Sequence, residues 1–251
     1  MNGIYRNHHT IAPAVQPTRS QRIRGLHVHH SSTHTTKGNC LMSYRRYKDT
    51  PVMNGNKKLG SIPNVSLLPI DTCINNSFCK DDCYAVKFVK LYTSVRNMWS
   101  ENTDLAKKNP EAFFNGIRKA LIGLTPEFFR IHVSGDFFSQ DYFDMWCDLA
   151  RDFPATNFLA FTKAYKFMHK NRQSLPENLE IVLSIFPGLD LPLSLLHYPV
   201  AAAGTVGQYE QSHRVTPERI SDAVHCPGNC STCSVCWSLA KKNLDVRFSI
   251  H

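Results

Sequence analysis

The chain has 251 residues, a formal net charge of +9 and 42% hydrophobic residues, which is enough for one full core or at most two small domains. It contains no run of 18 apolar residues and opens on no charged-then-apolar leader. We therefore expect no membrane span and no secretory signal. Nine cysteines in a chain without an export signal favour reduced, metal-bound thiols in the cytoplasm over a disulfide framework.

The positive charge is concentrated at the amino-terminal end. Residues 1–48 contain eight Lys or Arg, six His and no acid, whereas residues 49–251 contain 21 basic and 20 acidic residues. Because residues 1–48 show no helical or strand period, we expect a disordered, basic, His-rich leader, with a metal-binding tract as the alternative. Met42 is an alternative translation start. Nucleic acid is a weakly supported partner, since the foldable part is nearly neutral.

Strand and helix patterns alternate from about residue 60. Strand patterns occur at Asn64–Ile70, Phe128–Ser134, Asn157–Thr162, Leu179–Ile185, Tyr198–Ala203 and Val246–Ile250. Helical patterns occur at Tyr84–Trp99, Pro110–Ile122 and Gln140–Arg151, the last two with Asn109 and Ser139 as candidate N-caps. This alternation predicts a parallel α/β fold in one domain over residues 49–251.

Two of these strands alternate polar and apolar side chains instead of being apolar throughout. Arg130, His132, Ser134 and Asp136 share one face of their strand, and the last strand repeats the pattern with Arg247, Ser249 and His251. A barrel with a polar interior at one end produces such strands, so we predict a partial (βα)6 TIM-like barrel. An antiparallel sheet with one solvated face is the alternative.

Seven cysteines fall in two tight sets, which we call the first and the second cysteine set. The first set is Cys73, Cys79 and Cys83, spaced C-x5-C-x3-C, and the second is Cys226, Cys230, Cys233 and Cys236, within residues 225–237. Thiols this close in sequence converge readily on a metal ion or an iron–sulfur cluster. Three thiolates leave a coordination position open for chemistry, whereas four close the site.

Polar residues follow several strands, at the end where catalytic groups gather in α/β barrels. The candidates for cofactor binding are Ser134, Gly135, Asp136, Lys163, Ser184, Arg247 and His251. Simpler roles are open for several of them: Asp136 as a helix cap, Lys163 as a solvated loop residue, Arg247 as an ion-pair residue and His251 as a frayed terminus.

A first strand followed by a three-cysteine loop ending in Cys-Tyr-Ala resembles the radical S-adenosylmethionine superfamily. The same loop, the HVSGDF segment, the late CP…C-x2-C-x2-CW run and the terminal FxxH together resemble the phage gene product 88 family. The resemblance covers roughly residues 58–251. It implies a phage protein in the host cytoplasm, with a barrel domain that carries the second cysteine set as an auxiliary loop.

The resemblance implies a four-iron, four-sulfur cluster on Cys73, Cys79 and Cys83. Its fourth iron would bind S-adenosylmethionine, whose reductive cleavage yields methionine and a 5′-deoxyadenosyl radical that abstracts hydrogen from an unknown substrate. Gly135 and Asp136 would contact the methionine amino group. Flavodoxin or ferredoxin would serve as the electron donor.

Iron–sulfur ligation and zinc binding both fit the second cysteine set. Its compact x3, x2, x2 spacing resembles a ferredoxin run read backwards, whereas zinc sites usually pair two cysteine knuckles across a longer gap. An auxiliary iron–sulfur cluster is therefore expected, with zinc as the alternative. The corresponding rival function is a non-catalytic or nucleic-acid-associated zinc protein.

Overall fold

The computed structural model describes residues 46–168, 172–189, 191–209 and 215–249. The chain divides into two units, Met1–Cys40 and Leu41–His251, and every described residue belongs to the second. Most of the predicted leader lies outside the described residues. Its last residues, however, belong to the fold, because Arg46 pairs with Met53 in a β-bridge and its guanidinium lies 2.7 Å from the Glu101 carboxylate. Residues 46–48, which the sequence assigned to the leader, therefore belong to the folded region.

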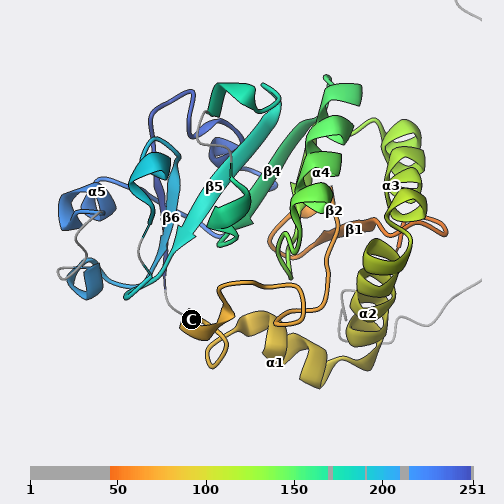
Figure 1. Ribbon diagram of the computed structural model, residues 1–251, viewed down its shortest axis with the longest axis horizontal. Coiled ribbons are helices and arrows are strands. Elements are labelled where there is room, and N and C mark those ends of the chain that lie inside the picture. Colours follow the sequence, from red (N-terminus) through yellow and green to blue (C-terminus); the bar gives the residue numbers. More distant parts are fainter. Residues whose placement is uncertain (1–45, 169–171, 190, 210–214, 250–251) are drawn as a thin grey trace, which may run out of the picture. The chain divides into compact units, whose positions relative to one another are not determined.

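Eight strands form one open sheet in the order β1-β2-β3-β4-β5-β6-β8-β7 (Figure 1). The strands are β1 (Met53–Asn56), β2 (Gly60–Asn64), β3 (Phe128–Ile131), β4 (Asn157–Thr162), β5 (Leu179–Ile185), β6 (Val200–Ala203), β7 (Val224–His225) and β8 (Val246–Phe248). Every neighbouring pair is parallel except the β1–β2 hairpin. The predicted parallel sheet is confirmed, and the antiparallel alternative is wrong.

The helices follow the strands as the sequence pattern indicates. The α-helices are α1 (Tyr84–Leu91), α2 (Thr93–Lys108), α3 (Pro110–Leu124), α4 (Gln140–Asp152) and α5 (Pro217–Ser221). Short 3-10 helices are η1 (Asn76–Phe78), η2 (Tyr165–Phe167), η3 (Arg172–Ser174), η4 (Leu193–Leu195), η5 (Val206–Tyr209) and η6 (Val235–Ser238). Both predicted N-caps are confirmed: the Asn109 side chain accepts from Ala112 N, and the Ser139 hydroxyl accepts from Tyr142 N.

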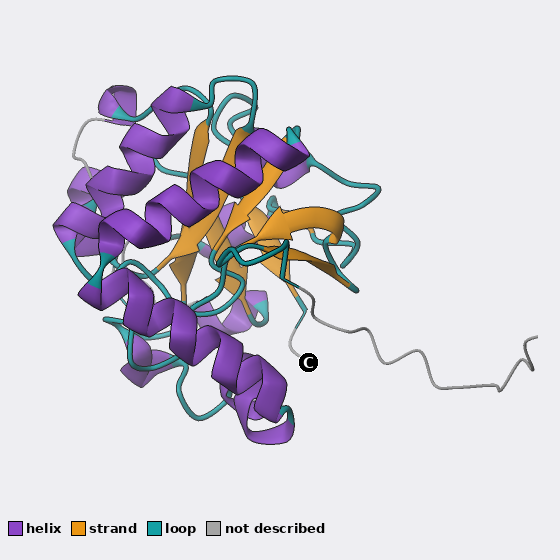
Figure 2. Cartoon of the chain, turned by 90° about the vertical axis from the view of Figure 1, so that its right-hand side faces the viewer, coloured by secondary structure: helices purple, strands orange, loops and turns teal. Residues whose placement is uncertain are grey.

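The two faces of the sheet bury different partners. Alternate strand residues such as Ile131, Ala160 and Ile181 pack with α3 and α4 in the main core, and we call this the helical face. Figure 2 shows helices packed along one side of the strands. The opposite face carries Leu159 and Val182 and packs against residues 226–239, which include the second cysteine set. We call it the cysteine face.

Several predicted boundaries move for identifiable reasons. The predicted helix Tyr84–Trp99 is two helices, because the backbone at Tyr92 is extended. The first predicted strand begins earlier, at Gly60, although its continuation still pairs through Val65 N to Arg130 O. β3 ends at Ile131 because His132 has a left-handed φ of 55°. No described helix combines the length and apolar character needed to cross a bilayer.

Candidate functional site

The first cysteine set lies on the connection from β2 to α1, beside the carboxyl end of β4. Cys73 and Cys79 flank η1, and Cys83 is the residue before α1. The amide of Asn75 donates to the carbonyl oxygen of Lys163 over 2.7 Å, which ties this loop to the residue after β4. The sequence prediction that the three-cysteine loop meets the strand-end polar residues is confirmed for Lys163.

Asp136 joins the ends of β3 and β4. Its carboxylate accepts hydrogen bonds from the Thr162 hydroxyl (2.5 Å), from Lys163 N (2.8 Å) and from Phe137 N (2.8 Å). Only 2% of its surface is exposed. Asp136 is not the cap of α4, because Ser139 has that role. It positions the Thr162–Lys163 turn.

We predict that Asp136→Ala destabilises the fold. The substitution leaves three buried donors without their acceptor, so the free energy of unfolding should fall by roughly 2–4 kcal/mol. Urea denaturation of the metal-free protein measures the change. Asp141→Ala, at an exposed position in the first turn of α4, is the matched control and should cost less than about 1 kcal/mol. Equal stabilities of the two variants would contradict a positioning role for Asp136.

The charged groups around the first set shift the pKa values of its thiols in opposite directions. Burial, followed by the neighbouring Asp136 carboxylate, raises the pKa of Cys73 to about 11. Burial also raises the pKa of Cys79, against the opposing charge and hydrogen bond of the Lys163 ammonium group. Metal binding at these thiols must therefore displace protons. Lys163 is the cation placed to offset the resulting negative charge, and its Nζ also lies 5.1 Å from the centre of the Phe186 ring.

The second cysteine set lies between β7 and β8 and covers the cysteine face. Cys226 N donates to the Arg247 carbonyl oxygen, and Cys230 N donates to the Lys58 carbonyl oxygen in the β1–β2 turn. The adjacent Trp237 is 7% exposed, and its indole N–H donates to the carbonyl oxygen of Phe129 over 3.3 Å. The predicted auxiliary loop is thus hydrogen-bonded both to β8 and to the β1–β2 turn, near opposite edges of the sheet.

Arg130 lies on the cysteine face between the two sets. Its guanidinium stacks on Phe161, with Cζ 4.1 Å from the ring centre, and its buried Nε has no hydrogen-bond partner. Burial lowers the pKa of Arg130, and that effect is opposed by Tyr84 first and then by Cys236, Cys230 and Cys226 of the second set. Tyr84 directly follows Cys83 and donates to the Val133 carbonyl oxygen. Segments far apart in the sequence therefore meet at one half-buried cation.

Arg130 and His132, which the sequence places on one polar face of their strand, lie on opposite faces of the sheet in the structure. His132 belongs to the helical face, where its ring stacks on Tyr142 and its Nε2 lies 3.0 Å from the Tyr142 hydroxyl. Burial, then the charge of Arg130, lowers the pKa of His132 to about 3, so the imidazole is neutral. Its left-handed backbone, which a sequence pattern does not reveal, turns the side chain away from the face of Arg130.

The other candidate residues occupy three different places. The Ser134 hydroxyl is buried without a partner, and Gly135 has a φ of 84° at a position where a Cβ would lie 2.7 Å from Leu67 Cβ. Ser184 is on the cysteine face, since it pairs with Ala201. Arg247 pairs with Ala202 and so belongs to the helical face, away from the first set. His251 lies outside the described residues.

The donor chemistry of both sets fits a thiolate-bound metal centre. All seven thiols are free of disulfides, and each set is close enough for its members to perturb one another's ionisation. Among the described residues, no three Cys, His, Asp or Glu side chains already form a complete group of metal ligands. Metal binding would therefore draw the thiols of each set together.

These features define an open, mostly parallel α/β protein with one cysteine set at the strand ends and another on the cysteine face. The family model described as Gene product 88 matches residues 41–239, and the chain belongs to this phage family. Two relatives are the Gene 88 proteins of Mycobacterium phages D29 and L5. Each is 30% identical over 123 residues, covering 44% of this chain and 50% of the relative.

The chain thus spans about half the length of the curated relatives it matches. No solved structure matches it significantly. The predicted membership of the gene product 88 family is confirmed, and the comparisons carry no support for the resemblance to radical S-adenosylmethionine enzymes.

Proposed function

We propose that the protein is a radical S-adenosylmethionine-type iron–sulfur enzyme acting on an unknown substrate. One observation carries the proposal: a three-thiol loop meets the polar carboxyl ends of adjacent parallel strands, through the bond from Asn75 to Lys163. In parallel α/β folds this edge is where reacting groups gather. Three thiols also leave one coordination position for a ligand that the protein does not supply.

The strand order supports the architecture that such an enzyme needs. From β2 to β6 the parallel strands are neighbours in chain order, with β8 next, which is the winding of an α/β barrel. We interpret the open sheet as a partial (βα)6 barrel. Its cysteine face would then be the interior, where Arg130, Phe161 and Ser184 lie.

The bound cluster and S-adenosylmethionine would supply one-electron chemistry, and Cys73, Cys79 and Cys83 would hold the cluster. The protein's own residues position and shield that site. Lys163 offsets thiolate charge beside Cys79, and Asp136 fixes the turn that carries Lys163. Ser134 lies two residues before Asp136 in the sequence. Its hydroxyl is buried without a hydrogen-bond partner, so it is available to a bound molecule. A small electron-transfer protein such as flavodoxin or ferredoxin would be the reductant.

The second cysteine set would hold an auxiliary iron–sulfur cluster. Four thiols close the coordination shell, and Arg130 provides a half-buried positive charge beside it. Such a centre relays electrons or braces the loop that covers the cysteine face. Zinc bound by the same four thiols would provide only the brace.

Anaerobic reconstitution tests the proposal. We expect the protein to bind iron and sulfide at both sets and to absorb broadly through thiolate-to-iron charge transfer. After reduction it should bind S-adenosylmethionine, measured by calorimetric titration, and slowly form 5′-deoxyadenosine, measured by chromatography. The control is protein loaded with zinc, which should form none.

Two outcomes would contradict the proposal. A fully iron-loaded protein that neither binds S-adenosylmethionine nor forms 5′-deoxyadenosine would exclude the radical mechanism. A colourless protein that retains stoichiometric zinc at both sets, and refuses iron under reconstitution, would favour the zinc-binding alternative.

A further inference from the structure

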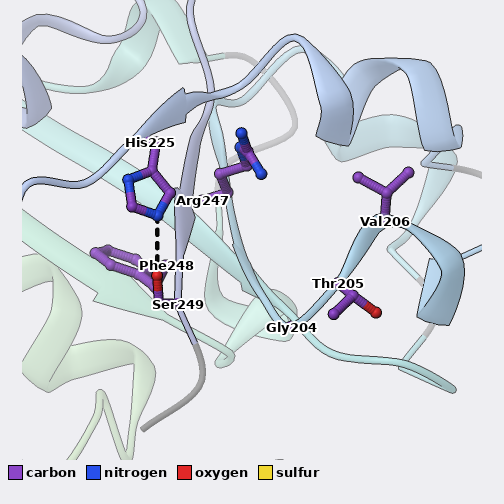
Figure 3. A pocket seen from close by; sticks show the side chains of 7 residues that line it. All are labelled: Gly204, Thr205, Val206, His225, Arg247, Phe248 and Ser249. Carbon is purple, nitrogen blue, oxygen red and sulfur yellow. Dashed lines mark hydrogen bonds between the residues drawn. The ribbon is translucent and has the colours of Figure 1, made fainter.

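A pocket of about 400 Å³ lies where β6 and β8 end (Figure 3). Its Arg247 belongs to the helical face, opposite the face of Arg130. Thr205 and Val206 form one wall, after the Gly204 turn, and the other comes from β7, β8 and the residue after β8. Volumes of this order, within roughly 300–1,000 Å³, hold small organic ligands and exceed what a simple ion needs. None of the described residues that line the pocket is acidic.

Three polar side chains share one side of this pocket. His225 and Arg247 are directly paired neighbours on β7 and β8, and Ser249 follows two positions after Arg247. Paired residues of parallel strands point to the same face, as do residues two apart on a strand. The His225 Nε2 lies 2.9 Å from the Ser249 hydroxyl, so the imidazole is held in place (Figure 3).

Arg247 lacks the anion that a half-buried arginine normally has. Arg172 and Arg219, which are comparably buried, pair with Glu180 (2.7 Å) and Asp245 (2.5 Å). Across the described residues, the Arg247 side chain has no hydrogen-bond or ion-pair partner, and its Nε is buried. A guanidinium whose Nε is buried and unpaired favours an anionic group beside it.

We propose that this pocket binds a small organic phosphate, with its phosphate group against Arg247. The planar guanidinium matches two phosphate oxygens, while the hydrogen-bonded pair of His225 and Ser249 offers one further donor to a group that has three acceptor oxygens. Val206 supplies apolar surface for the organic part. The site is separate from the first cysteine set and does not depend on the proposed radical chemistry.

Calorimetric titration of the full chain tests the site, with adenosine 5′-monophosphate as the probe and adenosine as its phosphate-free counterpart. We expect the monophosphate to bind and adenosine not to bind. Arg247→Gln should weaken binding about tenfold to a hundredfold, the range for losing a charge-assisted hydrogen bond. Arg247→Lys should retain part of the affinity. Lys242→Gln, which removes an exposed positive charge, should bind like the wild type.

Thermal unfolding is the folding control: Arg247→Gln and the wild type should unfold at the same temperature. Equal affinities of the two proteins for the monophosphate, or no binding to either, would overturn the proposal. Binding of malonate in preference to the monophosphate would assign the pocket to carboxylates and also overturn it. Saturating S-adenosylmethionine should leave monophosphate binding unchanged, and competition between them would show that the pocket is not a separate site.

Discussion

Replacing Cys73, Cys79 and Cys83 together with alanine should remove one metal centre and leave the other intact. The two sets are fastened independently, the first to Lys163 through Asn75 and the second to Lys58 through Cys230 N. We expect the reconstituted triple variant to lose about half of its iron and sulfide if both sets hold four-iron clusters, and all formation of 5′-deoxyadenosine.

Iron and sulfide analysis beside the absorption spectrum measures this result. Cys147→Ala is the control, since Cys147 is a buried residue of α4 that packs in the main core and belongs to neither set. Wild-type iron and sulfide in the triple variant would show that the first set is not a cluster site. Loss of all iron would show instead that the second set depends on the first.

Replacing Arg130 with glutamine should selectively weaken the second centre. A metal bound by four thiolates carries net negative charge, and Arg130 is the half-buried cation beside it without an acidic partner among the described residues. Removing that charge should cost roughly 2 kcal/mol, or about thirtyfold in metal affinity at the second set. If the centre is an iron–sulfur cluster, its reduction potential should become more negative, because the added electron loses a nearby positive charge.

Competition with a chelator measures metal retention, and a spectroscopic redox titration measures the potential. Arg130→Lys keeps the charge and should restore most of both properties. Arg151→Gln, at an exposed ion pair with Asp148, should change neither. If Arg130→Gln retains both the wild-type metal affinity and the wild-type potential of the second set, Arg130 is not its counter-ion.

The sequence predicted those elements whose periodicity and caps are strong. β4 and β5 match their predicted bounds, and α3 and α4 begin at the predicted residues because Asn109 and Ser139 cap them. The β1–β2 hairpin was missed, since the segment Met53–Asn56 is short and polar and lacks the alternation typical of strands. Its burial comes from tertiary packing of Met53 against α1 and α2, which local sequence does not encode.

The candidate site was predicted best where residues are close in sequence. The cysteines of each set lie near one another because they are close in sequence. Lys163 approaches the first set because it follows a parallel strand, at the edge of the sheet where that set also lies. The prediction that Arg247 shares the face of the strand-end polar residues was wrong, because the polar register of β8 alone does not say which face of the sheet the helices cover. Arg130 was not singled out, although its polar position in an apolar strand was the available signal. Its importance depends on the thiols of the second set, which are more than ninety residues away in sequence.

The bond from Cys230 N to the Lys58 carbonyl oxygen has a consequence for biosynthesis. Lys58 lies in the β1–β2 turn, and a Cβ on the neighbouring Gly60 would come within 2.5 Å of Ser231 Cβ, so these distant segments fit closely. Contacts of such long sequence separation form late, because closing a long loop is entropically costly. The second cysteine set therefore cannot reach its folded arrangement until β8, which follows it, has left the ribosome as well. Loading of that set would come after the first set has been synthesised and has folded.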